Sequence, residues 1–386
     1  MGRAGGHGVR VSIDHHQHLG GLPTGCETTA EIGSGRGDRV TPARWEPTMT
    51  RMTDASTRAR DARLRAALEE AAGWYRVRLV ALRPATVMGL LRERGLADLA
   101  VGTPAGVRWR VGHASGGVSR TGLVEHLRRC GFGAEEMVAA GLAVPARPHG
   151  GAGGGRWGSG VVDVLRHRLV VPLVDGGGVV GFTARRLSED NPAVPKWVNT
   201  ATTALYRKGG HLLGLAQQAE QLMAGRGRVV LVEGAVDAIA VDLAGHIGLA
   251  AGGTQLTAAH AGQLREAAAA TGGPVLVAYD GDQPGRDATL RAADLLGGLD
   301  ARTVRLPEGL DPADVLVAAG ARGLRRALGV TVPLVDAAVS ARLDRWAVHA
   351  GNPVALVDAV RDVAGLVAAA PADLVTATLL DAAAPS

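Results

Sequence analysis

The stretch VLVAYDGDQPGRDA, from Val275 to Ala288, runs from mostly apolar residues straight into Asp280-Gly281-Asp282, a Pro-Gly pair and a helical pattern. Asp, Gly and Pro are ordinary turn residues, so the stretch could be a strand followed by a polar turn. It could also be part of a metal site, because open α/β folds place ligands at the carboxyl edge of a parallel sheet. The residues around the stretch decide between the two interpretations.

The segment from Arg228 to Val330 alternates between apolar strands and helical patterns of about ten to fifteen residues. Continuous apolar strands separated by helices of this length are typical of a parallel sheet with helices on both faces. This pattern predicts an α/β fold. The expected strands are RVVLVEG, IGLAAGG, PVLVAYDGD and RTVRLP, and the expected helices are Ala235–Ala244, Leu256–Ala270 and Pro284–Leu296.

Acidic residues follow the expected strands of this sheet. Glu233 ends the first strand, Asp280 and Asp282 end the third, and Asp311 follows the fourth. The carboxyl ends of parallel strands share one edge, so these four carboxylates are expected to converge in one cleft. They would repel one another there, and an oxygen-preferring cation such as Mg²⁺ or Mn²⁺ would neutralise them. Asp237, one helical turn after Glu233, could support the same site. The set of acids favours a metal site over unrelated turns and helix caps.

The charge distribution indicates a polyanionic partner. The 386-residue chain has a formal net charge of +5. Residues 156–210 carry a net charge of +4 and residues 229–330 carry −4, so a basic surface beside an acidic cleft would suit a phosphate substrate. The 42 basic residues include only two lysines, Lys196 and Lys208. Where arginine is the usual cation, these two exceptions suggest positions that need a compact ammonium, although chance placement remains an alternative.

No apolar run reaches the roughly 18 residues needed to span a membrane. The first twenty residues contain DHHQH where a secretory signal needs an apolar core, so we expect a cytoplasmic protein without membrane association. Cys26 and Cys130 stand far apart and lack CxxC spacing, which predicts neither a disulfide framework nor a zinc site.

Four regions are expected along the chain. Residues 1–55 are rich in Gly, Thr, Pro and Arg without periodicity, as in a disordered leader. Residues 56–227 mix helical and strand patterns and carry the basic residues, which predicts an α+β basic subdomain. Residues 228–330 form the parallel-sheet domain, and residues 331–386 have the pattern of a C-terminal helical subdomain.

Within the basic subdomain, helical spacing predicts helices over Ser56–Arg78 and Pro84–Gly95, and two more short helices within residues 119–143. A Pro/Gly-rich loop follows over Ala146–Gly160. HRLVVPLVDGGGVVGFTARRL is then expected to form a hairpin around its Asp-Gly-Gly turn.

The motifs VEGAVD, GGTQLT, YDGDQPGRDA and DPAD, in this order and setting, resemble the Rossmann-like Toprim domain of bacterial DnaG-type primases. Upstream, ALEEAAGWYRVRL and LLRERGL are similar to the helical start of the primase polymerase core. VLRHRLVVPLVDGGGVVGFTAR, PKWVNT and YRKGGHLLGL resemble its basic subdomain, and Lys196 and Lys208 fall on lysines of that family. The resemblance covers residues 55–384, and the combined motifs are far more specific than a DxD pair alone.

This resemblance implies a DNA-templated RNA polymerase that makes short primers from NTPs on single-stranded DNA, in the cytoplasm at the nucleoid. A 3′-hydroxyl would attack the α-phosphate of an NTP and release pyrophosphate, with two Mg²⁺ or Mn²⁺ ions assisting. Glu233 would act as a catalytic acid or base or orient a metal, and Lys196 and Lys208 would also belong to the catalytic set. The implied metal ligands are Glu233, Asp280, Asp282 and Asp311, and the implied template or nucleotide contacts are Arg166, Arg168, Arg185, Lys196 and Lys208.

Several features depart from the family pattern. The family begins with a zinc-binding domain and often ends with a helicase-interacting domain, and this sequence supplies neither. A helicase or a separate zinc-binding chain is therefore an expected partner. EGAVD has Ala235 where the family usually has an aromatic residue, and Asp314 lies three residues after Asp311 where the family often has two. A non-catalytic Toprim protein that binds DNA or mediates recombination, and a Toprim nuclease, remain alternatives.

Overall fold

The computed structural model describes residues 46–116, 119–146, 160–188, 193–280, 282–347 and 353–371. The chain divides into two units, Met1–Arg51 and Met52–Ser386, and all contacts below lie within the second. The expected disordered leader falls mostly outside the described residues, but helix α1 spans Glu46–Val80, so that expectation is wrong for residues 46–55. Arg, Met and Ala are good helix formers, and the helix therefore continues N-terminally beyond the apolar stripe that predicted it.

A five-stranded sheet has the strand order β11-β10-β9-β7-β8. Strands β7, β8, β9 and β10 run parallel, as predicted. Strand β11 pairs antiparallel with β10, which corrects the expectation that the chain is helical from residue 331. Pro333 ends this edge strand, where a missing N–H group disturbs no central ladder. The strands span Val229–Val232 (β7), Ile247–Ala250 (β8), Val275–Val277 (β9), Ala301–Val304 (β10) and Thr331–Pro333 (β11).

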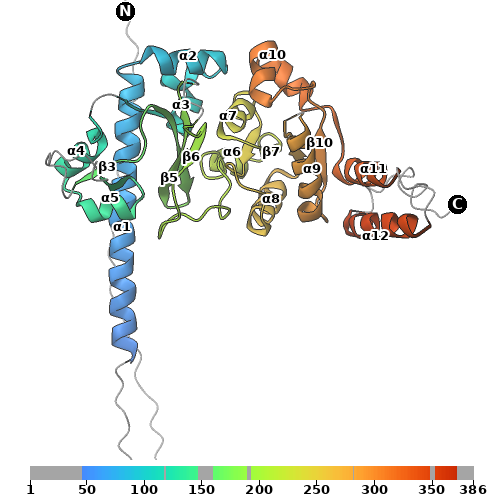
Figure 1. Ribbon diagram of the computed structural model, residues 1–386, viewed down its shortest axis with the longest axis horizontal. Coiled ribbons are helices and arrows are strands. Elements are labelled where there is room, and N and C mark those ends of the chain that lie inside the picture. Colours follow the sequence, from blue (N-terminus) through green and yellow to red (C-terminus); the bar gives the residue numbers. More distant parts are fainter. Residues whose placement is uncertain are drawn as a thin grey trace, which may run out of the picture. The chain divides into compact units, whose positions relative to one another are not determined.

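Helices cover both faces of this sheet, because successive residues of a strand point to opposite faces. Val230 and Val232 of β7 share a core with helices α7 and α10, whereas Val229 and Leu231 share a core with α8 and α9 (Figure 1). This confirms the predicted α/β class and the three expected helices; α10 was not predicted. The helices span Ala235–Leu243 (α7), Ala258–Thr271 (α8), Gln283–Leu296 (α9) and Pro312–Ala327 (α10).

The basic subdomain is built on an antiparallel sheet with the order β1-β4-β5-β6. Its centre is the predicted hairpin of β4 (Arg168–Asp175) and β5 (Gly178–Arg186). Helix α1 packs on one face of this sheet, where Leu68 and Tyr75 share a core with Phe182. The remaining elements are α2 (Ala85–Glu93), η1 (Ala97–Ala100), α3 (Pro104–Trp109), β1 (Gly112–Ala114), α4 (Gly122–Arg129), α5 (Ala134–Ala139), β2 (Ala143–Pro145), β3 (Val161–Asp163), β6 (Trp197–Asn199) and α6 (Ala219–Met223).

Helices α11 (Leu334–Ala347) and α12 (Pro353–Ala369) pack on each other and confirm the expected C-terminal helices. Leu334 of α11 and Val363 of α12 join the same core as α8 and α9. The rest of the expected helical region, residues 372–386, lies outside the described residues.

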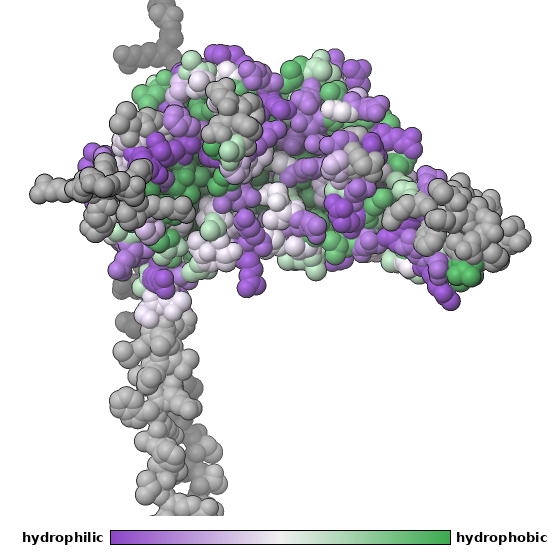
Figure 2. All heavy atoms as spheres, viewed as in Figure 1, coloured by the Kyte–Doolittle hydropathy of each residue, from purple (hydrophilic) through white to green (hydrophobic). Residues whose placement is uncertain are grey.

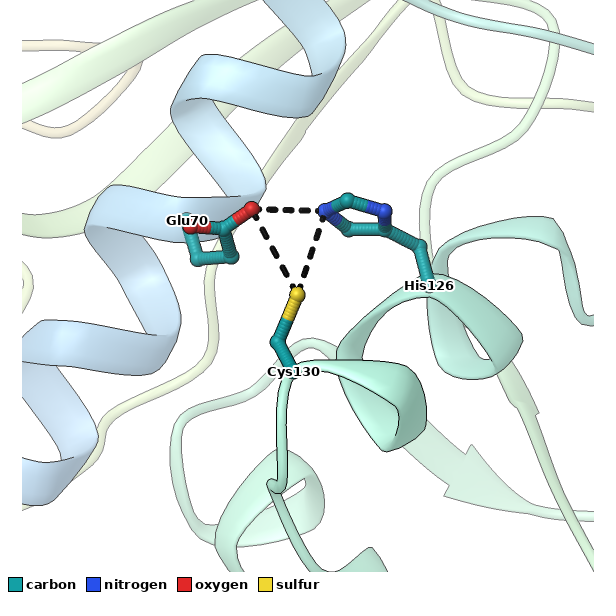
Figure 3. A group of neighbouring side chains, drawn as sticks. All are labelled: Glu70, His126 and Cys130. Carbon is teal, nitrogen blue, oxygen red and sulfur yellow. Dashed lines mark hydrogen bonds and ion pairs between the residues drawn. The ribbon is translucent and has the colours of Figure 1, made fainter.

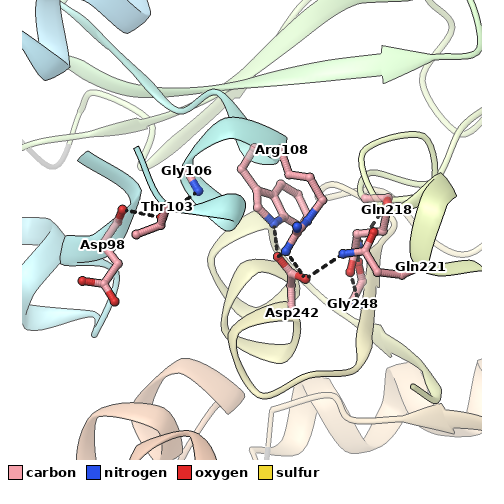
Figure 4. A network of polar contacts seen from close by, with 10 residues as sticks. Asp98, Thr103, Gly106, Arg108, Gln218, Gln221, Asp242 and Gly248 are labelled. Atoms are coloured by element: carbon pink, nitrogen blue, oxygen red, sulfur yellow. Dashed lines mark hydrogen bonds and ion pairs between the residues drawn. The ribbon is translucent and has the colours of Figure 1, made fainter. Parts of the chain in front are cut away.

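A buried polar junction connects the basic subdomain to the parallel-sheet domain (Figure 4). Asp242 of α7 is 7% exposed and accepts hydrogen bonds from Arg108 Nη2 at 2.8 and 2.9 Å. It also accepts one from Trp109 Nε1 at 2.8 Å. Apolar contacts continue around the junction, since Trp109 and Val230 belong to one core. The junction therefore attaches α3 to α7 and holds the basic sheet beside the acidic edge.

The face drawn in Figure 2 carries mostly hydrophilic residues, with apolar residues in small groups between them. Among the helices that the structure describes, none combines the length and apolar character that crossing a membrane requires.

Candidate functional site

A pocket lies at the carboxyl edge of the five-stranded sheet. Glu233 directly follows β7, Asp280 lies just beyond β9, and Asp311 lies in the segment after β10. These three residues line the pocket together with Arg185 and Lys196 from the basic subdomain. The structure thus brings predicted metal ligands and predicted nucleotide contacts into one pocket. Its other walls are Arg94, Thr183, Trp197, Asn199, residues 234–237, Gly252 and Gly253.

Two acids lie between β9 and α9: Asp280 soon after the strand, and Asp282 immediately before the helix. The backbone N–H of Asp280 donates to Glu233 Oε1 at 3.3 Å, which connects two neighbouring strand ends. Asp282 is the N-cap of α9, and its Oδ1 accepts from the Gly285 N–H at 2.8 Å. A Cβ atom at Gly285 would lie 2.1 Å from the Asp280 carbonyl oxygen, so only glycine fits. Asp282 therefore caps a helix, whereas Asp280 belongs to the acidic pocket.

Asp311 is also a helix N-cap. Aspartate suits both roles, since its carboxylate can accept from a backbone N–H and can also bind a cation. Its Oδ1 accepts from the Asp314 N–H at 2.6 Å at the start of α10. The other oxygen, Oδ2, lies 3.2 Å from Arg94 Nη1, and the same nitrogen lies 2.9 Å from Asp314 Oδ1. Arg94 comes from the end of α2, far away in sequence, and no sequence pattern predicted its place at the site.

Burial and mutual repulsion raise the pKa values of the acids in the pocket. Burial is the main cause at Asp280, followed by the charges of Glu233 and Asp311, and the pKa of Asp280 rises to about 6. Burial also raises the pKa of Glu233, with further contributions from Asp282 and Asp311. Asp237 is 8% exposed, and burial followed by the charge of Asp311 raises its pKa well above the ordinary value. An added cation would relieve this repulsion.

The four acids that line the pocket would offer a cation carboxylate oxygens only; they are Glu233, Asp237, Asp280 and Asp311. Such a donor set fits a hard cation such as Mg²⁺ or Mn²⁺ and suits zinc less well. Asp282 does not line the pocket and is exposed, but its charge acts on both Glu233 and Asp280.

The basic wall faces these acids. Lys196 is exposed and immediately precedes β6, whereas Arg185 on β5 is 7% exposed. Asn199 of β6 donates from Nδ2 to the Gly252 carbonyl at 2.7 Å, which joins the wall to the loop after β8. The Oδ1 atom of Asn199 is buried and has no partner within the described residues. No sequence pattern predicted this acceptor.

Arg168 was predicted to contact the template or the nucleotide, but in the structure its side chain is buried. Its guanidinium group is buried, and it donates to the carbonyl of Pro195 at 3.1 Å from both Nη1 and Nη2. Further bonds reach the carbonyls of Ala184 at 3.3 Å and Lys196 at 3.4 Å. Burial, followed by the charge of Arg186, lowers the pKa of Arg168. In this arrangement Arg168 holds the backbone that carries Lys196.

Arg166 and Lys208 do not line the pocket. Arg166 lies between β3 and β4. Lys208 is exposed on a turn that is tied to α8, since Gly209 accepts from Thr257 Oγ1 at 2.8 Å and Gly210 accepts from Gln263 Nε2 at 2.8 Å. These two cations are therefore placed outside the acidic pocket.

We expect the metal-free protein to lose stability as the pH rises from about 4 to about 6. The pKa of Asp280 is raised from 3.8 to about 6 by folding, so the folded protein binds this proton more strongly than the unfolded chain. The resulting stability is fully present below the unfolded pKa and is lost as the pH rises through the folded one. Thermal unfolding in a chelator should show this fall for the wild type and a smaller one for Asp280→Asn. Equal falls in both proteins would contradict the electrostatic account.

Two family models match the chain. Residues 74–219 match the N-terminal domain of the DNA primase catalytic core, and residues 230–316 match a Toprim-like domain. The DNA primase of Mycobacterium tuberculosis is 34% identical over 229 residues, which is 57% of this chain and 34% of that protein. The DNA primase of Streptomyces coelicolor is 33% identical over 301 residues, which is 76% of this chain and 44% of that protein. The chain thus spans less than half the length of these relatives.

Solved structures with a similar fold cover most of the chain. The RNA polymerase domain of the Mycobacterium tuberculosis primase DnaG has 30% sequence identity and a TM-score of 0.64, and the match covers 83% of this chain and 96% of that one. The catalytic core of the E. coli primase has 25% identity and a TM-score of 0.63, with 80% and 92% covered. The described fold therefore corresponds to nearly the whole of these solved domains.

Proposed function

Because the chain belongs to the DnaG-type primases and contains the catalytic core of that family, we propose that it makes short RNA primers from NTPs on single-stranded DNA. The observation that carries this proposal is the pocket in which Glu233, Asp280 and Asp311 face Arg185 and Lys196. Carboxylates on one side can hold cations, and basic groups on the other can hold a triphosphate. A nucleotide between the two walls would have its reacting phosphate at the acids.

In this mechanism Glu233, Asp280 and Asp311 would hold Mg²⁺ or Mn²⁺, with Asp237 behind them and Asp282 adding charge at the rim. When bound, such ions polarise the α-phosphate and lower the pKa of the attacking 3′-hydroxyl. Alternatively, with Asp280 and Asp311 holding the ions, Glu233 would act as the general base that takes up the hydroxyl proton.

The basic wall would bind and orient the nucleotide. Lys196 would contact the phosphates, and the buried Arg185 would provide a fixed positive charge behind it. Arg168 would act as a positioning residue for Lys196 through the Pro195 carbonyl.

Template binding would use cations outside the pocket. Arg166 and Lys208, which do not line the pocket, would serve this role. We propose that the basic subdomain comprises residues 56–227, the Toprim domain residues 228–330 and the helical subdomain residues 331–386. The similar Mycobacterium tuberculosis domain has been solved in complex with double-stranded DNA, once with a 6-nucleotide overhang. A helicase or a separate zinc-binding chain remains a proposed partner.

The test is primer synthesis on single-stranded DNA by the full chain with NTPs and Mg²⁺ or Mn²⁺. RNA product made only in the presence of template and divalent cation would support the proposal. Intact DNA binding without product would favour the non-catalytic Toprim alternative, and cleaved template would favour the nuclease alternative.

Lys196→Arg is expected to reduce primer synthesis about tenfold or more although the charge is kept. Lys196 is one of the two lysines in the chain, and it lines the pocket together with the buried Arg185. A planar guanidinium is bulkier and cannot rotate its donors onto a phosphate in the same way. The steady-state rate should fall for Lys196→Arg but not for Arg226→Lys, a conservative exchange at an exposed position outside the pocket. Full activity of Lys196→Arg would show that its rarity has no functional cause.

A further inference from the structure

A second cluster of potential metal ligands lies in the basic subdomain (Figure 3). Glu70 Oε1 lies 2.7 Å from His126 Nε2, and Cys130 Sγ lies 3.6 Å from the same carboxylate oxygen and 3.8 Å from His126 Nε2. We propose that these three side chains form a binding site for one Zn²⁺ ion or a chemically similar divalent cation. The proposal does not depend on primer synthesis.

The separations between the three donor atoms suit tetrahedral coordination. With Zn–S of about 2.3 Å and Zn–N or Zn–O of about 2.0–2.1 Å, a sulfur ligand lies about 3.5 Å from a nitrogen or oxygen ligand. Both distances from Cys130 Sγ in the structure are within a few tenths of an ångström of this value. Only the His126–Glu70 edge is short, and it must open by about 0.7 Å to reach the separation of about 3.4 Å that a shared ion requires.

Two helices hold these donors in place. His126 and Cys130 are four residues apart at the end of α4, so their side chains project from the same face. Glu70 projects from α1 toward them (Figure 3). Beneath the cluster, Leu127 and Leu68 are fully buried in the core shared by α1 and α4. Both backbones are therefore fixed by packing, and little ordering would be required on binding.

The surroundings leave a way in for an ion. Cys130 is exposed, and the Glu70 and His126 side chains are 43% and 23% exposed. The ring centroid of Trp74 lies 6.0 Å from that of His126, and the two rings are tilted by 37° to each other. Three protein ligands with a solvent-facing fourth position is an arrangement that zinc adopts with water as its last ligand.

This cluster and the pocket at the sheet edge are expected to prefer different metals, because their ligand atoms differ. Thiolate and imidazole select borderline cations such as Zn²⁺ over Mg²⁺, whereas the sheet-edge acids have the opposite preference. An ion pair between His126 and Glu70 alone would not need the thiol within 3.8 Å of both partners. A bound ion would join α1 to α4 and so stabilise the folded subdomain by mass action.

Cobalt binding to the reduced, metal-stripped full chain tests the proposal. Co²⁺ coordinated by a thiolate produces a sulfur-to-metal charge-transfer band, which a carboxylate site such as the sheet edge cannot produce. The wild type should bind one Co²⁺ with this band, and Zn²⁺ should displace it. Cys130→Ser should lose the band, and His126→Ala and Glu70→Gln should weaken binding by at least about tenfold, as loss of a ligand costs at least as much as loss of its outer partner.

Matched controls remove two other possible sources of metal binding, the second cysteine and the N-terminal histidine cluster. Cys26→Ser removes the other cysteine, and a variant with His15, His16 and His18 all changed to alanine removes the N-terminal histidine cluster. Both should keep the band and its affinity. Zn²⁺ should raise the unfolding temperature of the wild type and of Cys26→Ser, but not that of Cys130→Ser. Absence of the band in the wild type, or its survival in Cys130→Ser, would overturn the proposal.

Discussion

Asp280→Ala is expected to reduce primer synthesis by at least about a thousandfold, since removing one preorganised electrostatic group from a catalytic site commonly costs 10²–10³ in rate and a lost metal ligand removes more. Asp280 lines the pocket, and its pKa is raised by burial and by Glu233 and Asp311, so it is coupled to the whole acidic cluster. Extension of a labelled primer on single-stranded DNA with Mg²⁺ measures the effect.

Asp282 allows the charge to be separated from the helix cap. Asp282→Asn keeps an oxygen that can accept from the Gly285 N–H, because asparagine is as good an N-cap as aspartate, but it removes the negative charge. If the charge matters, Asp282→Asn and Asp282→Ala should lose similar amounts of activity. Thr103→Ala removes a comparable cap, on α3, where Thr103 Oγ1 accepts from the Gly106 N–H at 3.1 Å. It should cost about 1 kcal/mol of stability and leave synthesis intact.

Equal primer synthesis by wild type and Asp280→Ala would contradict the metal assignment at the sheet edge. Normal activity of Asp282→Asn with loss in Asp282→Ala would mean that Asp282 acts only as a cap. DNA binding by every variant must be measured alongside, because a loss of binding in Asp280→Ala would point to misfolding.

Asp242→Ala is expected to lower the free energy of unfolding by about 3 kcal/mol or more, the usual cost of removing one partner of a buried ion pair. The Asp242 side chain is 3% exposed, and its loss leaves both Trp109 Nε1 and Arg108 without their shared acceptor (Figure 4). The Arg108 side chain is 26% exposed, so water can solvate its guanidinium in the variant. The decrease in the free energy of unfolding should therefore lie close to about 3 kcal/mol. Urea unfolding monitored by tryptophan fluorescence measures it.

Asp242→Asn should destabilise less than Asp242→Ala, because its amide oxygen can still accept from Trp109 Nε1. The matched control is Asp300→Ala, which breaks a surface pair in which Asp300 Oδ1 lies 3.0 Å from Arg302 Nε and the side chains are 39% and 34% exposed. Such pairs contribute at most about 1 kcal/mol. A similar loss from Asp242→Ala and Asp300→Ala would show that the junction adds no particular stability.

Hydrophobic periodicity and turn residues predicted most helices and strands around the pocket, because these signals come from residues close together in the sequence. The apolar run before Asp280 became β9, and the alternation around it became a parallel sheet with α7, α8 and α9 on its faces. The same patterns failed where the wider fold decides the outcome. Residues 331–333 became an edge strand because β10 offers them a partner, and the predicted leader overlaps a helix that extends beyond its own apolar stripe.

The sequence by itself determined which strand ends carry acids, because strand ends and helix caps are set by neighbouring residues; Glu233, Asp280 and Asp311 do meet in one pocket. Tertiary structure alone decided which distant side chains join them. Arg94 reaches Asp311 across 217 positions, and Glu70 reaches Cys130 across 60. The absence of CxxC spacing predicted no zinc site, yet packing of α1 on α4 places a carboxylate beside a His and a Cys one helical turn apart. Contacts between residues so far apart in sequence depend on how whole helices pack, so no short-range sequence pattern predicts them.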